Sequence, residues 1–128
     1  MAREVEFADV RRRVAEFGSL ATLVTVTDAG TPHTVSVEVS PGDDRLVCAV
    51  GARTLANVSV RPGIALLWSP VDGGDYQLIL DGTAVATASD RGDGLAEIAV
   101  EVSMGILHRL AGRRGTGATC VALDATRV

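Results

Sequence analysis

The residues best suited to chemistry lie at 51–54, where Gly-Ala-Arg-Thr follows an apolar run and opens a segment with helical character. The first turn of a helix presents unpaired N–H groups and a partial positive charge to an anion. Arg53 adds a guanidinium that can hold a phosphate through two parallel hydrogen bonds, and Thr54 adds a hydroxyl. The segment therefore suits two interpretations: a phosphate-binding site, or an ordinary helix start in which Thr54 caps the helix and Arg53 is solvated.

Other catalytic or metal chemistry finds little support in the sequence. No G-x-S-x-G segment is present, and the two histidines, His33 and His108, are far apart and lack H-x-x-x-H spacing. Cys48 and Cys120 form no C-x-x-C pair, and two cysteines are too few for a disulfide scaffold or a cysteine-only zinc site. We therefore expect neither a hydrolytic triad nor a metal site, and we name no catalytic residue.

The composition limits the partners that the protein can have. The net charge of −4 argues against nucleic-acid binding, which normally needs a basic face. All 12 basic residues are arginine, so a phosphate-binding cation must be arginine and Schiff-base chemistry through lysine is excluded. No run of about 18 apolar residues is present, and the N-terminus is charged at once, so we expect no membrane span and no signal peptide. We expect a cytoplasmic protein.

Hydrophobic periodicity predicts the elements that position these residues. Val35, Val37 and Val39 alternate with polar residues, as in a strand that is buried on one face. Residues 95–110 instead place apolar side chains three or four positions apart, which predicts a helix. A Gly inside a strand suggests a bulge, so we expect a bend at Gly82. The predicted strands are 20–27, 32–40, 45–50, 64–68, 76–88 and 119–123, and the predicted helices are 4–17, 53–60 and 95–110.

The number of predicted strands favours a closed β architecture. The first three strands should form an antiparallel meander, and an antiparallel sheet of about six strands usually closes into a barrel or a sandwich. The chain has 128 residues, which is close to the usual size of one domain. We therefore expect a single domain over residues 1–128.

The order of short motifs between 30 and 86 resembles that of the pyridoxamine 5'-phosphate oxidase-like family. A Gly-x-Pro-His start at 30–33 leads into the second predicted strand. Asn57 and an Arg-Pro pair at 61–62 precede the fourth strand, and Gly-x-Ala at 82–84 lies in the fifth. No single motif is diagnostic, but their order and spacing together are specific. The resemblance covers about half of the chain and implies a six-stranded antiparallel split β-barrel with flanking helices.

The resemblance also implies a cofactor and an activity. Proteins of this family are homodimers with two sites at the subunit interface, each holding FMN or the deazaflavin coenzyme F-420. The implied function is an oxidoreductase that transfers hydride through this cofactor to or from an unknown small molecule. The phosphate of the cofactor would lie near Arg53 and Thr54.

Further cofactor contacts follow from matching positions in the family. The second and third strands would run along the cofactor, and a Gln five residues before Gly82 would hydrogen-bond the ring edge. His33 either faces the cofactor or simply follows a turn, and Asn57 either contacts the ligand or braces its helix. The implied cofactor-binding residues are His33, Ser36, Ala49, Val50, Arg53, Thr54, Asn57 and Gln77.

One position departs from the family pattern. Family members commonly carry lysine where Thr54 stands, so one phosphate-binding cation is absent here. This departure favours a non-catalytic carrier or sensor of flavin as an alternative to an FMN oxidoreductase. A reductase that depends on coenzyme F-420 is another alternative, and a split barrel that has lost its ligand and persists as a structural dimer is a third.

Overall fold

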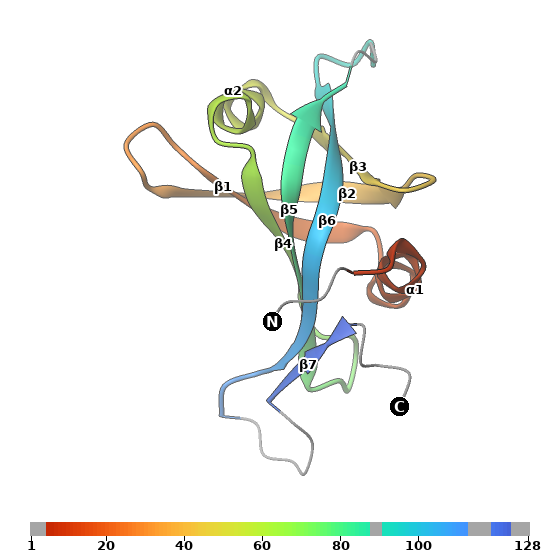
Figure 1. Cartoon of the computed structure of the whole chain (residues 1–128). Helices are drawn as coiled ribbons and strands as arrows, with labels where there is room; N and C mark the ends of the chain where they lie inside the picture. The colour runs from red at the N-terminus through yellow and green to blue at the C-terminus, as the bar shows by residue number, and fades with distance from the viewer. Residues whose placement is uncertain (1–4, 88–90, 113–118, 124–128) are drawn as a thin grey trace.

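The computed structural model describes residues 5–87, 91–112 and 119–123 of the chain, and most of them lie in strands (Figure 1). The two helices and the strands follow one another as α1 (Phe7–Phe17), β1 (Leu20–Val26), β2 (Pro32–Pro41), β3 (Leu46–Val50), α2 (Ala52–Val60), β4 (Gly63–Trp68), β5 (Tyr76–Ala86), β6 (Ala96–Arg109) and β7 (Cys120–Ala122).

The strands form a closed antiparallel barrel. Their order in the sheet is β3-β2-β1-β4-β5-β6-β7. A further pairing of β3 with β6 closes the six strands from β1 to β6 into a ring. Strand β7 pairs with β6 outside this ring. The predicted six-stranded antiparallel split barrel with flanking helices is therefore confirmed, as is the meander of β1, β2 and β3.

The alternation predicted for β2 sets which side chains enter the barrel. Val37 and Val39 are buried and Val35 is partly buried, whereas Ser36 and Glu38 are exposed. The aliphatic core is completed mainly by side chains from the facing strands, which fits the small aromatic content of the chain. Its largest fully buried members are Trp68, Leu23, Leu46, Leu66, Leu78, Leu80 and Ile98.

The bend predicted at Gly82 is present. The pairing of β5 with β6 shifts register between Asp81 and Gly82, as in a β-bulge. A Cβ atom at Gly82 would lie 2.5 Å from the main-chain oxygen of Glu101 and 2.9 Å from Cγ1 of Val100. Glycine is therefore required here because the backbone of β6 approaches too closely for any side chain.

The helix predicted for 95–110 is wrong, because this segment is strand β6. Strand β6 pairs with β5 along one edge and with β3 along the other, so its hydrogen bonds go to distant parts of the chain. Ile98, Ala99 and Val100 are consecutive and all buried, which hides the alternation of a half-buried strand. The helical spacing of the apolar residues is thus a coincidence within a strand that is buried on both faces at 98–100.

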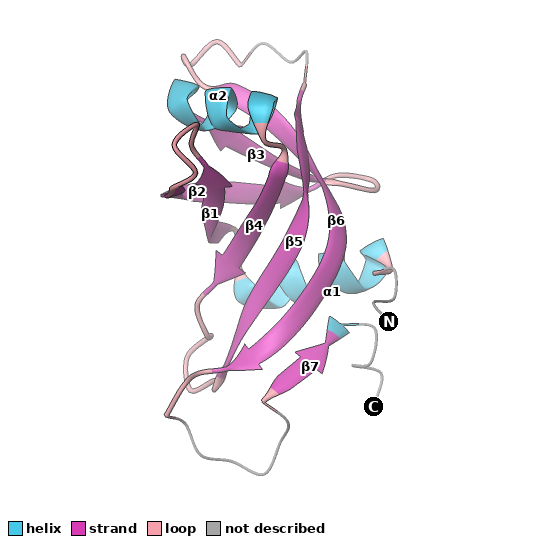
Figure 2. Cartoon of the chain, turned by 60° about the vertical axis from the view of Figure 1, so that its left-hand side comes forward, coloured by secondary structure: helices cyan, strands magenta, loops and turns pink. Residues whose placement is uncertain are grey.

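The helices lie at different parts of the barrel. Helix α1 buries Val10 and Val14 and ends at Gly18, whose φ of 98° suits glycine, as predicted. Helix α2 crosses the end of the barrel opposite β7 (Figures 1 and 2). Neither helix in the described part of the chain is long and apolar enough to cross a membrane. The cytoplasmic location stays a prediction.

Candidate functional site

The candidate site is a cavity at the point where β2 and β3 separate. These strands pair at only three positions, from Val39 opposite Cys48 to Pro41 opposite Leu46. Beyond this ladder β3 continues along β6 and then gives way to α2. An open cavity of about 480 Å³ occupies the split between residues 33–37 of β2 and residues 49–54.

The cavity gathers most of the residues that the resemblance implied. Six of the eight line it, namely His33, Ser36, Ala49, Val50, Arg53 and Thr54. Val35, Val37 and Leu95 add apolar surface. The inward direction of the two valines was predicted from the alternation of β2. The contribution of Leu95 was not, because it depends on how β6 closes the barrel.

The N-terminus of α2 opens into this cavity. The first helical hydrogen bond runs from the N–H of Leu55 to the carbonyl of Gly51, so the N–H groups of the preceding helical residues have no helical acceptor. The N-cap position is Gly51, which has no side chain to occupy these groups. Thr54 is only 2 % exposed and does not stand at the capping position. An anion in the cavity could accept hydrogen bonds from this turn.

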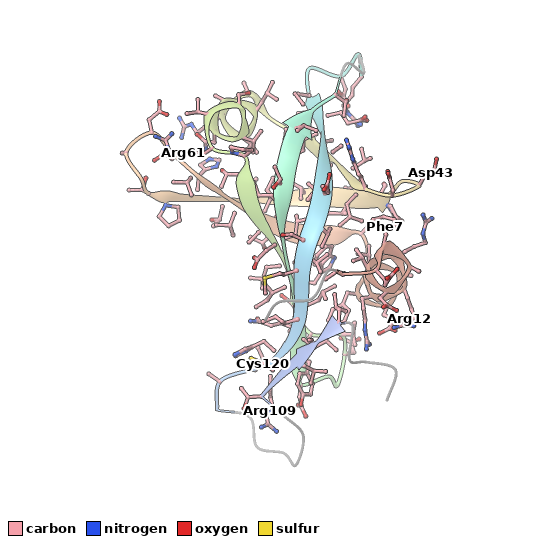
Figure 3. All side chains as sticks on the ribbon, in the orientation of Figure 1. Phe7, Arg12, Asp43, Arg61, Arg109 and Cys120 are labelled. Carbon is pink, nitrogen blue, oxygen red and sulfur yellow. The ribbon has the colours of Figure 1, made fainter. Side chains whose placement is uncertain are left out.

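Arg53 is exposed and has neither an ion pair nor a hydrogen bond within the described residues. Arg61, at the other end of α2, behaves differently (Figure 3), since its Nη1 lies 2.8 Å from Oδ1 of Asp28. Arg45 likewise faces Glu101 at 3.9 Å. Arg53 is therefore a cation that the protein leaves available at a helix start, which fits the phosphate-binding interpretation.

The edge of β2 supplies main-chain groups to the cavity. The hydrogen bond from Val39 N–H to the carbonyl of Ser19 fixes the phase of the β1–β2 ladder, so odd-numbered residues of β2 bond to β1. The main-chain groups of Thr34 and Ser36 then point to the opposite edge, where β3 has already turned away. Ser36 thus lines the cavity although its side chain is exposed on the outer face.

His33 stands at the start of β2, opposite Thr25 of β1. Its Nδ1 atom is buried and has no hydrogen-bond partner in the described structure. Burying a polar atom without a partner costs free energy, so the position of His33 in the lining of the cavity calls for an explanation, and a bound ligand is one. His33 therefore has hydrogen-bonding capacity that the described chain does not use.

Asn57 and Gln77 do not line the cavity. The Nδ2 group of Asn57 donates to the hydroxyl of buried Thr25 at 3.1 Å, so Asn57 braces α2 against β1. Gln77 lies at the start of β5, opposite His108, at the end of the barrel away from α2 (Figure 1). The predicted contact of Gln77 with a cofactor ring stays a prediction.

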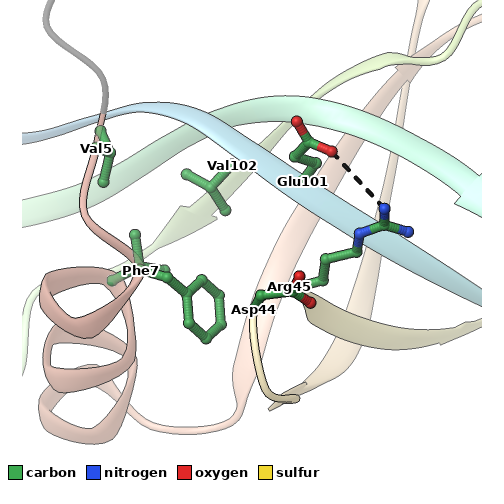
Figure 4. A pocket seen from close by; sticks show the side chains of 7 residues that line it. Val5, Phe7, Asp44, Arg45, Glu101 and Val102 are labelled. Carbon is green, nitrogen blue, oxygen red and sulfur yellow. Dashed lines mark ion pairs between the residues drawn. The ribbon is translucent and has the colours of Figure 1, made fainter.

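A second hollow lies beside α1 (Figure 4), with a volume of about 280 Å³. Phe7 and Val102 form its apolar wall, and Arg45 and Glu101 face each other at its rim. The positive charge of Arg45 is matched by a carboxylate on the same rim. The hollow therefore lacks the unmatched cation that distinguishes the cavity at the split.

Sequence comparisons identify two relatives of this chain. A search against models of protein families finds no match. Two curated proteins are 37% identical to this chain over 99 residues, which is 70% of the chain and 70% of each relative. They are the uncharacterised proteins Mb0449c of Mycobacterium bovis and MT0457 of Mycobacterium tuberculosis.

Solved structures with low sequence identity share the fold. A protein from Clostridium acetobutylicum related to general stress protein 26, of the pyridoxinephosphate oxidase family, superimposes with a TM-score of 0.67 at 13% identity, covering 92% of this chain and 95% of its own. A heme binding protein from Mycobacterium smegmatis gives 0.66 at 17% identity, covering 97% and 61%. An F420 reductase gives 0.60 at 15% identity, covering 73% and 94%.

The closed six-stranded barrel, its split and these neighbours define the class: the chain is a split-barrel protein with the pyridoxamine 5'-phosphate oxidase-like fold. The resemblance seen in the sequence is thereby confirmed. Within this class, the chain belongs to one family with the two mycobacterial proteins Mb0449c and MT0457.

Proposed function

We propose that this protein binds a flavin-type cofactor, FMN in the first place, in the cavity at the split and acts as an oxidoreductase. The observation that carries the proposal is Arg53, a cation with no partner in the described structure, at a helix start that opens into the cavity. The neighbours support it, because they include a putative pyridoxamine 5'-phosphate oxidase and a FAD-binding protein.

The residues of the cavity fit the parts of such a cofactor. Arg53 and the N–H groups of the first turn of α2 would hold the phosphate. The apolar side chains of Val35, Val37 and Val50 would lie along the ring system and exclude water. The main-chain groups of Thr34 and Ser36 could bond the polar edge of the ring. The bound cofactor would supply the hydride chemistry, while the protein provides binding and orientation.

We further propose that the working form is a homodimer. The cavity is open in a single chain, and a further hollow of about 380 Å³, lined by polar and apolar residues of β1, β4 and the loop after β4, also reaches Ser36. Leu20 in the lining of this hollow is 65% exposed, which a second copy could cover. A contact between Gln77 and the cofactor ring would then have to come from the second copy, because Gln77 does not line the cavity of its own chain.

One observation favours the deazaflavin coenzyme as the alternative ligand. Arg53 is the only permanently charged side chain among the described residues that line the cavity. A phosphate monoester such as that of FMN carries about −1.5 to −2 charges at pH 7, whereas the phosphodiester in the tail of coenzyme F-420 carries one. A single arginine matches the diester more closely. A carrier of flavin without catalysis needs the same contacts and differs only in turnover.

The proposal is tested by titrating the purified protein with FMN, coenzyme F-420 and hemin, and by comparing Arg53→Ala with Arg45→Ala. Arg45 is the matched control, because it is an exposed arginine that is paired with Glu101 outside the cavity. We expect Arg53→Ala to weaken binding of FMN or F-420 at least tenfold, since a hydrogen bond to a charged group is worth about 1.5–3 kcal/mol. Arg45→Ala should leave the affinity unchanged.

Four other outcomes would change the conclusion. Binding of neither cofactor by the wild type, or equal effects of the two arginine substitutions, would contradict the proposed site. Tight binding of hemin alone would replace flavin with heme as the cofactor. If the cofactor binds but is neither reduced by a reduced nicotinamide nor reoxidised by an acceptor, the result would support the carrier instead of the oxidoreductase.

A further inference from the structure

We propose that His33, when protonated, supplies a second positive charge for the phosphate of the cofactor, so that phosphorylated ligands bind more tightly as the pH falls. The inference rests on the proposed function, because it concerns the same cavity. It goes further in assigning to one side chain a pH-dependent control of affinity.

The first step is the balance of charge in the cavity. A phosphate monoester brings about −1.5 to −2 charges at pH 7. The described lining offers one permanent cation, Arg53, and the partial positive charge of the α2 N-terminus, about half an elementary charge. Thr54 provides no charge. The described lining therefore leaves part of the phosphate charge unmatched unless another group is protonated.

The second step is that His33 is the other side chain in the lining that can become positive. Histidine is the side chain whose ordinary charge change falls between pH 5 and 8. His33 lies in the same cavity as Arg53, and its buried Nδ1 atom has no partner among the described residues. A bound anion would therefore meet an imidazole that is not already committed to a carboxylate.

Polar and charged groups from β1 and α2 surround His33. Strand β1 presents the hydroxyl of Thr25, and helix α2 presents Arg53, the amide of Asn57 and, at its end, Arg61. The carboxylate of Asp28 follows β1, but it is held by Arg61 at 2.8 Å. The charged side chains around His33 are therefore Arg53, which has no partner among the described residues, and the paired Arg61 and Asp28.

The sign of the coupling follows from this arrangement. An anion placed between Arg53 and His33 favours the charged form of histidine, so binding takes up a proton. Affinity must then rise as the pH falls through the range in which His33 titrates. Protonation of the phosphate itself, with a second pKa of about 6, acts in the opposite direction. The contribution of His33 is therefore measured against a variant that cannot take up the proton.

The test measures the FMN dissociation constant at about pH 8 and about pH 6 for the wild type, His33→Gln and His33→Lys. We expect the wild type to gain several-fold in affinity relative to His33→Gln between these pH values, because only the wild type takes up a proton at position 33 when FMN binds. His33→Lys carries its charge at both values and should bind FMN tightly at both. Riboflavin has no phosphate, so its affinity ratio between wild type and His33→Gln should not change with pH.

The contrary outcomes separate the inference from the proposed function. If wild type and His33→Gln keep a constant FMN affinity ratio from pH 8 to pH 6, His33 is not the second cation, although FMN binding that depends on Arg53 still stands. If riboflavin shows the same pH-dependent ratio as FMN, the effect does not act through the phosphate and the inference fails. If the wild type binds FMN at neither pH, the inference fails, and the proposed function fails with it if coenzyme F-420 does not bind either.

Discussion

Arg53 and Arg61 differ in whether they form an ion pair with a described residue. Both are arginines of the same short segment, and the sequence gives no sign of which one is committed to an ion pair. The structure pairs Arg61 with Asp28 at 2.8 Å and leaves Arg53 beside the cavity without a partner in the described chain. Residues 51–54 alone suited two interpretations, and both the family resemblance and the surroundings of Arg53 favour phosphate binding.

The candidate residues differ in how well their roles could be predicted. Residues 33–36 and 49–54 flank the same split, and the family resemblance, not local sequence, implied that they come together. Asn57 was open to two interpretations, and its bond to Thr25 supports the bracing role. Gln77 was expected at the start of a strand and lies there, but the end of the barrel at which β5 begins is set by its pairing with β4 and β6, which local sequence does not determine.

Cys48 gives a prediction about stability at alkaline pH. Burial raises the pKa of its thiol from 9.0 to about 12, so the folded protein keeps this proton when the unfolded chain has lost it. The stability that Cys48 contributes is therefore complete below pH 9 and is lost progressively as the pH rises toward 12. Between pH 9 and pH 10 the wild type should lose about 1 kcal/mol more free energy of unfolding than Cys48→Ala.

Denaturant unfolding at the two pH values checks this expectation. Cys120→Ser is the matched control, because Cys120 is exposed and the substitution should leave the pH dependence of the wild type unchanged. The account of Cys48 is wrong if Cys48→Ala and wild type lose stability in parallel.

At the scale of elements, strand β6 shows where local patterns fail. Its apolar residues recur at three or four positions and predict a helix, yet each half of the strand is held by partners far away in the sequence. Three consecutive buried residues at 98–100 interrupt the alternation from which a half-buried strand is recognised. The half-buried strands β1 and β2 were predicted correctly, because one face of each is apolar and the other is more exposed.

The close approach of β5 and β6 gives a prediction at the same scale. Gly82→Ala would place a Cβ atom 2.5 Å from the main-chain oxygen of Glu101, which β6 cannot yield without loss of its ladder. Overpacking of this kind costs about 1–3 kcal/mol, so the free energy of unfolding should fall by that amount.

Gly63→Ala in β4 is the control for this measurement, because an added Cβ would meet no atom within 4 Å. Chemical denaturation of both variants measures the difference. Equal stabilities of the two variants would show that the bulge tolerates a side chain.

At the scale of the whole molecule, the number of barrel strands was predicted correctly for partly wrong reasons. The sequence indicated six strands, and the barrel has six. One of them is β6, which was predicted as a helix, whereas the predicted last strand is β7 and lies outside the ring. The closing contact between β3 and β6 is a pairing between distant segments, which no local window contains. The ordered motifs from 30 to 86 identified the architecture more reliably than the strand count.

The central claim for the whole molecule is that a flavin-type cofactor binds at the split, in the gap between β2 and α2. The main-chain amides of Thr34 and Ser36 point into this gap, whereas those of Val35 and Val37 are bonded to β1. The amides of 52–54 likewise precede the first helical hydrogen bond. Amides without a protein acceptor exchange fast, and a bound ligand that accepts their hydrogen bonds slows them.

Hydrogen–deuterium exchange with and without saturating FMN, resolved at single amides, is therefore the most direct measurement. The account predicts that Ser36, Thr34 and the amides of 52–54 slow at least tenfold when FMN binds. Val35 and Val37 should be slow in both states, and the turn at 42–45 should not respond. Slowing confined to other regions, or no change at 34, 36 and 52–54 under conditions where FMN is bound, would contradict the claim.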